Sequence, residues 1–147
     1  MAVVVGLGNG PLADLAIERA VEEAKLRGLE LVAVAPVSMT RSDDTSASSG
    51  YGHIRERTVA EAERRAAEIA ARSGVPCTAF VPPVPEHLGE AVLRAAGEFD
   101  AELIIVGMRR RTPVGKAVLG SESQDVLLGA DCAVIAVKLP EDVERAL

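Results

Sequence analysis

The sequence predicts an α/β fold in which five parallel strands form a doubly wound sheet with helices on both faces. Short apolar runs alternate along the chain with longer segments of helical period, and this alternation favours right-handed crossovers within a parallel sheet. The runs are rich in Val, Ile and Leu, as strands buried on both faces are. The chain has 147 residues with no internal repeat and no linker-like segment, so we expect a single domain over residues 1–147.

The N-terminal half is predicted to hold two strands and two helices. The first strand covers 2–7, because AVVVGL is apolar throughout and the glycines and proline that follow it end a strand. Apolar residues at helical spacing predict a helix over 12–27, and the second strand covers 29–37. Ser, Thr, Asp and Gly dominate 38–52, which predicts a mobile loop, and the Ala-rich segment 54–73 forms the next helix.

The C-terminal half continues the alternation of strands and helices. Prolines follow the third strand, and glycines stand where helices are expected to stop. The predicted elements are strands over 75–81, 103–106 and 132–138, helices over 86–98 and 121–128, and one weak helical turn within 140–147.

The most informative segment is the loop between Gly107 and Gly120, after the fourth strand. It contains four positive side chains and no Asp or Glu, although the formal charge of the chain is −6. The four are Arg109, Arg110, Arg111 and Lys116. Ligands of doubly wound proteins bind at the carboxyl ends of strands, and helix N-termini suit phosphate oxygens. The loop therefore predicts a site for a phosphorylated ligand, and the alternative is a solvated basic loop that makes surface contacts alone.

Two serines at the start of the following helix support the phosphate prediction. Ser121 and Ser123 place hydroxyl and backbone N–H groups within reach of a phosphate, although ordinary N-capping explains serine there almost as well. Glu122 lies between them and argues against a highly charged anion.

Composition excludes several classes of function. The acidic chain has three aromatic residues, so it lacks both a basic face and stacking platforms, and nucleic-acid binding is disfavoured. With neither a leader-like start nor an apolar stretch of ~18 residues, we expect a cytoplasmic protein without a membrane span. Neither Cys77 nor Cys132 belongs to a C-x-x-C pattern or stands beside a His. This is typical of small buried residues in a reducing compartment and not of a disulfide framework.

No catalytic or metal-binding pattern can be singled out. The early glycine cluster has Pro11 where a dinucleotide fingerprint needs its third glycine, and Gly115-Lys116 lacks the other fixed residues of a Walker A motif. His53 and His87 are isolated, so we predict no metal site. Because no nucleophile stands beside a base, we expect a binding protein rather than an enzyme.

The motif and the order of elements resemble the universal stress protein family over nearly the whole chain. The nucleotide-binding branch of that family carries G-x2-G-x9-G-[ST] between the fourth strand and the last helix. Here the pattern reads Gly107, Arg110, Gly120 and Ser121, which matches three of four fixed positions at the right spacing. The resemblance implies a Rossmann-like fold, a role in stress response or regulation, and binding of ATP or AMP, with Mg²⁺ only as a companion of the nucleotide. Weak ATP hydrolysis, a trait of some members, has no assignable base in this sequence.

The resemblance and the cationic loop together give a set of candidate nucleotide-binding residues. They are Gly8, Val34, Val106, Gly107, Arg109, Arg110, Gly120, Ser121, Glu122 and Ser123. The family's ATP-binding members usually carry Asp where this chain has Gly8, and Arg110 replaces a glycine that lets the backbone approach the ligand. A left-handed backbone at Arg110 would cost roughly 1–2 kcal/mol, whereas the guanidinium groups of Arg109 and Arg110 can make charge-assisted bonds to phosphate.

The apolar fifth strand predicts a homodimer, because an uncovered strand at a sheet edge pairs readily with another chain. The predicted interface comprises Ala133, Val134, Ile135, Ala136 and Val137. Two alternatives to nucleotide binding stay open. In one, the departures at Gly8 and Arg110 have closed the site and left a nucleotide-free homodimeric interaction module. In the other, the chain is a regulatory domain that docks on an unknown transporter or kinase partner through the 38–52 loop.

Overall fold

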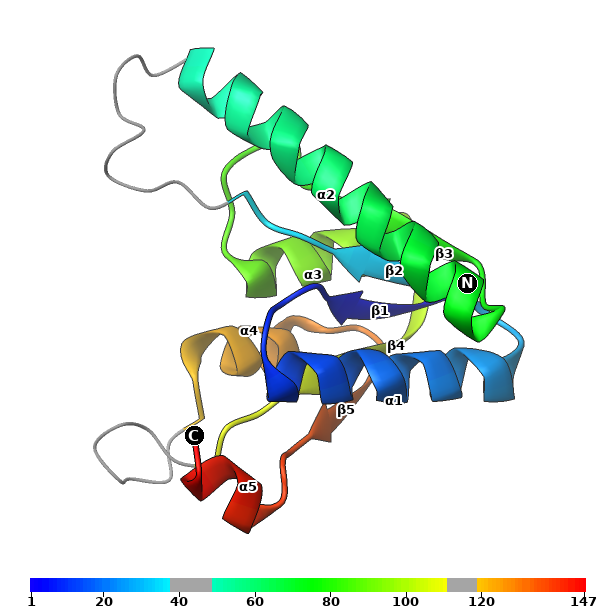
Figure 1. Cartoon of the computed structure of the whole chain (residues 1–147), viewed down its shortest axis with the longest axis vertical. Helices are drawn as coiled ribbons and strands as arrows, with labels where there is room; N and C mark the ends of the chain where they lie inside the picture. The colour runs from blue at the N-terminus through cyan, green and yellow to red at the C-terminus, as the bar shows by residue number, and fades with distance from the viewer. Residues whose placement is uncertain (38–48, 111–118) are drawn as a thin grey trace.

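One parallel sheet of five strands, in the order β3-β2-β1-β4-β5, forms the centre of the molecule (Figure 1). The computed structural model describes residues 1–37, 49–110 and 119–147. The strands are β1 (Ala2–Gly6), β2 (Glu30–Val34), β3 (Cys77–Phe80), β4 (Ala101–Gly107) and β5 (Ala133–Val137). Along the chain, the sheet grows outward from β1 through β2 to β3, then restarts on the other side of β1 with β4 and β5. This confirms the predicted doubly wound α/β fold.

Helices cover both faces of the sheet (Figure 1). They are α1 (Pro11–Arg27), α2 (Ser49–Ser73), α3 (Leu88–Glu98), α4 (Ser121–Gly129) and α5 (Glu141–Arg145). Alternate residues of the strands point to opposite faces. Val3 and Val5 therefore pack toward α1, whereas Val4 and Ile104 pack toward α3 and α4. A third cluster around Ala33 joins β2 to α2 on the face that also carries α1.

Small residues bring the helices close to the sheet. The buried positions of α1 are Ala16, Ala20 and Ala24. Ala91 and Ala95 of α3 are fully buried on the opposite face. Methyl side chains leave little distance between the helix backbone and the branched residues of the strands, so the interior is filled by Val, Ile and Leu from the sheet. No polar or charged residue is fully buried in the part of the chain that the structure describes.

Some predicted element bounds were wrong, and packing explains the largest error. α2 begins at Ser49, so the end of the predicted 38–52 loop is helical, while residues 38–48 lie outside the described residues. Gly50 and Gly52 are weak helix formers and hide this start in the sequence. Tyr51 and Ile54 pack against the cluster around Ala33, so tertiary contact outweighs local propensity.

All five strands differ in length from the prediction, and β2, β3 and β4 differ most. β3 covers Cys77–Phe80 rather than 75–81. β2 ends at Val34 rather than Val37, although the Ala35 N–H still donates to the Phe80 carbonyl at 2.9 Å. β4 begins at Ala101 because its first residues pair with the neighbouring strand. Glu102 is partly exposed and forms an ion pair with Arg27 at 3.1 Å. Because Glu102 is charged, the apolar run that predicts this strand begins only at Leu103.

No described helix combines the length and the apolar character that crossing a membrane requires. Both cysteines are free. Burial raises the pKa of the Cys77 thiol to about 11, and mainly the same cause raises the pKa of Cys132. Both thiols are therefore protonated at neutral pH, which suits small packing residues rather than nucleophiles. In the described ranges, no group of three or more His, Cys, Asp or Glu side chains is placed to hold a metal ion.

Candidate functional site

A cavity of about 190 Å³ lies where β1 and β4 diverge, at the carboxyl ends of these two strands. We call it the switch-point cavity. Its walls are the ends of β1 and β4 and the first turns of α1, α3 and α4. The chain leaves β1 toward one edge of the sheet and leaves β4 toward the other, so the connecting segments separate and leave a crevice.

The turn between β1 and α1 forms one rim of this cavity and is held from two sides. The Leu7 N–H donates to the Val34 carbonyl at 2.7 Å, and the Arg65 guanidinium donates to the Gly8 carbonyl at 2.9 Å. Gly10 has φ 98, a conformation that favours glycine, and Pro11 then starts α1 with its ring already set for a helix. The turn is thus fixed by local chemistry and by α2.

Apolar side chains occupy the space over the glycines of the cavity. A Cβ atom at Gly107 would lie 2.9 Å from Leu12 Cγ, and one at Gly6 would lie 3.1 Å from Leu88 Cδ1. Glycine at position 107 leaves room above the strand end that a side chain would otherwise fill. In the structure that room is taken by Leu12, which narrows the switch-point cavity.

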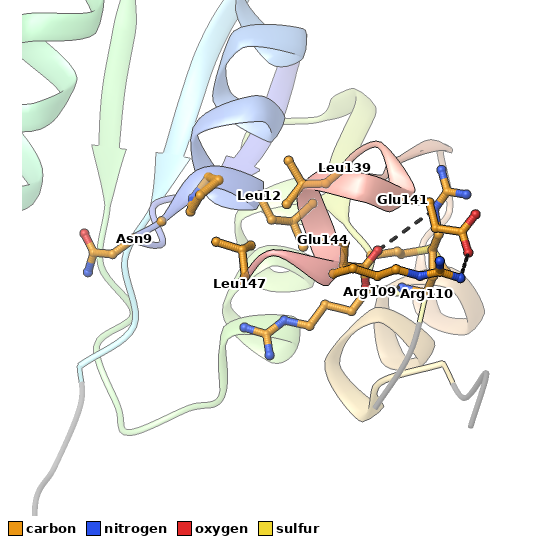
Figure 2. Close-up of a pocket in the computed structure, with 12 residues that line it drawn as sticks. Asn9, Leu12, Arg109, Arg110, Leu139, Glu141, Glu144 and Leu147 are labelled. Atoms are coloured by element: carbon orange, nitrogen blue, oxygen red, sulfur yellow. Dashed lines mark hydrogen bonds and ion pairs between the residues drawn. The ribbon is translucent and has the colours of Figure 1, made fainter. Parts of the chain in front are cut away.

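A wider cavity of about 460 Å³ lies next to the first, between the β1–α1 turn, Met108–Arg110 and α5 (Figure 2). We call it the α5 cavity. Asn9, Leu12 and Arg109 line both cavities. The wall of the α5 cavity is charged, with Arg109, Arg110, Arg145, Glu141 and Glu144, and apolar side chains such as Leu139 and Leu147 complete it. The two cavities therefore adjoin each other, and the α5 cavity has the more charged wall.

Arg110 is engaged by α5. Its backbone N–H donates to Glu144 Oε1 at 2.9 Å, and its Nε lies 4.0 Å from Glu144 Oε2. On the same helix, Arg145 donates to Glu141 at 2.7 Å. Just before Arg110, the Met108 N–H donates to the Val137 carbonyl at 2.8 Å and ties the strand end to β5.

The backbone of Arg110 is not in the left-handed region. Among the described residues, Asp100 is the only one besides glycines with positive φ. The cost that a left-handed backbone would have imposed at Arg110 therefore does not arise. Replacing the motif glycine with Arg is compatible with an unstrained loop at this point.

The structure brings most of the predicted nucleotide-binding residues together, but not all. Those that line the switch-point cavity are Gly8, Val106, Gly107, Arg109, Glu122 and Ser123. Arg110 lines the α5 cavity instead. Val34 is fully buried in the core cluster of α3 and is absent from the lining of both cavities. Arg111 and Lys116 lie outside the described residues.

Gly120 and Ser121 are exposed at the start of α4 and line neither cavity. Gly120 occupies the N-cap position, and no side chain caps this helix. Ordinary N-capping therefore does not explain the serines. Ser123 instead points back toward the strand, where its hydroxyl donates to the Gly107 carbonyl at 3.5 Å.

Sequence reasoning missed many of the residues that line the two cavities, and Leu12, Leu88, Gly89 and Glu144 are the ones that matter most for the arguments below. For Glu144 a signal was present, because the acidic run in the tail carries charge opposite to that of the loop. Leu12 directly follows a proline at a helix start, and this places it at the strand ends. Nothing in the sequence distinguishes Leu88 or Gly89 from ordinary residues of a helix.

Comparisons with known proteins agree with this architecture. The sequence profile of the Universal stress protein family matches residues 1–138. A universal stress protein from Mycolicibacterium smegmatis is 34% identical over 137 residues, covering 92% of this chain and 96% of the relative. The structure of a universal stress protein from Archaeoglobus fulgidus superposes with a TM-score of 0.71 at 26% identity, covering 94% of this chain and 98% of the other. A structure of the universal stress protein from that organism in complex with dAMP has a TM-score of 0.65 at 22% identity and the same coverage. The chain belongs to the universal stress protein family.

Proposed function

We propose that this protein binds an adenine nucleotide in the switch-point and α5 cavities and acts through that binding in stress response or regulation. The observation that carries the proposal is the pair of adjoining cavities at the point where β1 and β4 diverge, which together are lined by seven of the predicted residues. Doubly wound folds bind their ligands at this place. The dAMP complex of a similar protein supports an adenine nucleotide as the ligand.

The two cavities suit the two ends of a nucleotide. The switch-point cavity has apolar walls from Val5, Leu12 and Val92, which suit a purine. Arg109 lines both cavities and Arg110 lines the α5 cavity, so phosphate groups that extend from the purine meet cationic side chains. A cavity of 190 Å³ is small for a nucleoside. Binding therefore requires the side chain of Leu12 to rotate away from Gly107. Mg²⁺ would enter only with the phosphates.

A thermal-shift experiment tests the proposal. At ~100 times its dissociation constant, AMP or ATP should stabilise the folded protein by about 2.7 kcal/mol, and the transition should move up with nucleotide concentration. Arg109→Gln should reduce this shift, while Arg57→Gln, which changes an exposed arginine on α2, should leave it unchanged. The same thermal shift is measured with adenosine, and with ATP in the presence and in the absence of Mg²⁺.

The absence of a shift with every adenine compound would contradict nucleotide binding and favour the alternative of a nucleotide-free homodimeric interaction module. One structural observation favours that alternative. Leu12 and Leu88 pack over Gly107 and Gly6, in the space that a ligand would need. In that case the cavity is a remnant, and the apolar edge of the sheet becomes the main functional surface.

We also propose that β5 is the dimer interface, as its sequence predicts. β5 is the last strand of the sheet, and the side chains of Val134, Ile135 and Ala136 are partly exposed. An apolar strand with an unpaired edge is stabilised when a second copy covers it.

Placing a charge on this strand should separate the dimer. We expect Ile135→Lys to be monomeric in size-exclusion chromatography with light scattering, because a buried ammonium group at the interface is costly. Leu26→Lys is the matched control, because Leu26 is 80% exposed on α1, and this variant should stay dimeric. Circular dichroism confirms that both variants are folded. A dimeric, folded Ile135→Lys protein would place the interface elsewhere.

A further inference from the structure

Glu144 and Arg110 meet at the place where the proposed function puts the phosphates of the ligand. The Arg110 N–H donates to Glu144 Oε1 at 2.9 Å, and Arg110 Nε faces the second carboxylate oxygen at 4.0 Å. Figure 2 shows Glu144 and Arg110 in contact within the α5 cavity. A carboxylate that accepts from a backbone N–H beside a guanidinium makes the kind of contacts that a phosphate oxygen makes.

In the described part of the chain, Glu144 is the only acidic residue of α5 that contacts the N–H and the guanidinium of Arg110. Its side chain is 19% exposed, whereas Asp142 is exposed and Glu141 pairs with Arg145. Because Glu144 is largely covered, water and salt screen its charge less than they screen an exposed carboxylate. Its negative charge is therefore felt by any anion that enters the α5 cavity.

We propose that Glu144 is an internal competitor for the anion position at Arg110 and thereby a residue that sets the charge specificity of the site. The proposal rests on the proposed function, since it assigns the ligand phosphates to the α5 cavity. A phosphate on the Arg110 N–H must either displace the Glu144 carboxylate or lie against it. Both routes cost more as the charge of the ligand grows. The site therefore favours adenosine and AMP over ATP.

The first test asks whether the anion position exists and is occupied by Glu144. The amide signal of Arg110 is followed by NMR in the ¹⁵N-labelled full chain while inorganic pyrophosphate is added. In Glu144→Ala, this signal should move saturably, with a dissociation constant at least tenfold lower than in the unmodified protein, about 1.4 kcal/mol. Asp142→Asn removes the same charge from the same helix, so it controls for general electrostatics and should behave as the unmodified protein does. An equal response of the unmodified and Glu144→Ala proteins, or an equal gain in both variants, overturns the inference.

The second test measures charge specificity by calorimetry with adenosine, AMP and ATP. In Glu144→Ala the ratio of the ATP and AMP dissociation constants should fall at least tenfold, while the affinity for adenosine stays unchanged. Glu144→Gln keeps the length of the side chain and should shift the ratio in the same direction, so the test survives if the alanine variant does not fold. If no adenine compound binds either protein, the proposed function fails, and the pyrophosphate titration still decides the role of Glu144.

Discussion

Replacing Ile104 with alanine is expected to lower the free energy of unfolding by about 2–5 kcal/mol. Ile104 lies in β4 between β1 and β5, is fully buried, and packs under α3 and α4. The substitution removes three carbon atoms from a site where rigid strands and helices prevent collapse of the cavity that is left. For a chain of this size, each kcal/mol corresponds to about 2–4 °C in the unfolding temperature.

Urea denaturation followed by circular dichroism measures this loss. Leu128→Ala on α4 is the control, because its side chain is 80% exposed and its removal should change stability by no more than about 0.5 kcal/mol. Equal effects of the two substitutions would mean that β4 is not the centre of the core.

Replacing Gly89 with alanine is expected to destabilise the protein, whereas the same change at Gly97 in the same helix should stabilise it. A Cβ atom at Gly89 would lie 3.0 Å from the Glu122 carbonyl oxygen and 3.3 Å from its Cα. Both are backbone atoms of α4, so the contact is relieved only if one helix moves. Overpacking of this kind costs about 1–3 kcal/mol. At Gly97 nothing lies within 4 Å, so alanine brings its better helix propensity, about 0.5–1 kcal/mol.

Thermal unfolding of the two variants gives shifts of opposite sign if the packing is as described. A stabilised Gly89→Ala protein would contradict the close approach of α3 and α4. Because Gly89 and Glu122 both line the switch-point cavity, Gly89→Ala should also weaken adenine nucleotide binding, and Gly97→Ala should not.

The sequence was sufficient to predict the fold, and the features that mark its elements are local. Strands such as Ala2–Gly6 are marked by uninterrupted Val, and glycines at positive φ, such as Gly28 and Gly74, mark the ends of helices. The structure adds the strand order β3-β2-β1-β4-β5, which places the switch point between β1 and β4. The spacing from Gly107 to Ser121 identifies the same place from the motif alone.

The interior of the site could not be predicted, because it depends on contacts between distant parts of the chain. Glu144 binds the N–H of a residue 34 positions earlier, and Arg65 reaches a carbonyl 57 positions earlier. Spacing within one segment carries no information on such pairs. Val34 stays a prediction that the cavities do not support, since its side chain belongs to the core and lines neither of them.

The central pair of strands joins parts of the chain that are synthesised far apart in time. Ala2 of β1 pairs with Ala101 of β4, so about a hundred residues must leave the ribosome before the middle of the sheet can close. Pairing over such a separation is slow, because the loop entropy is lost before the contacts form. A nascent fragment that stops before β4 has no partner for that side of β1 and no crevice for a ligand. The switch-point cavity is therefore among the last features of the molecule to form.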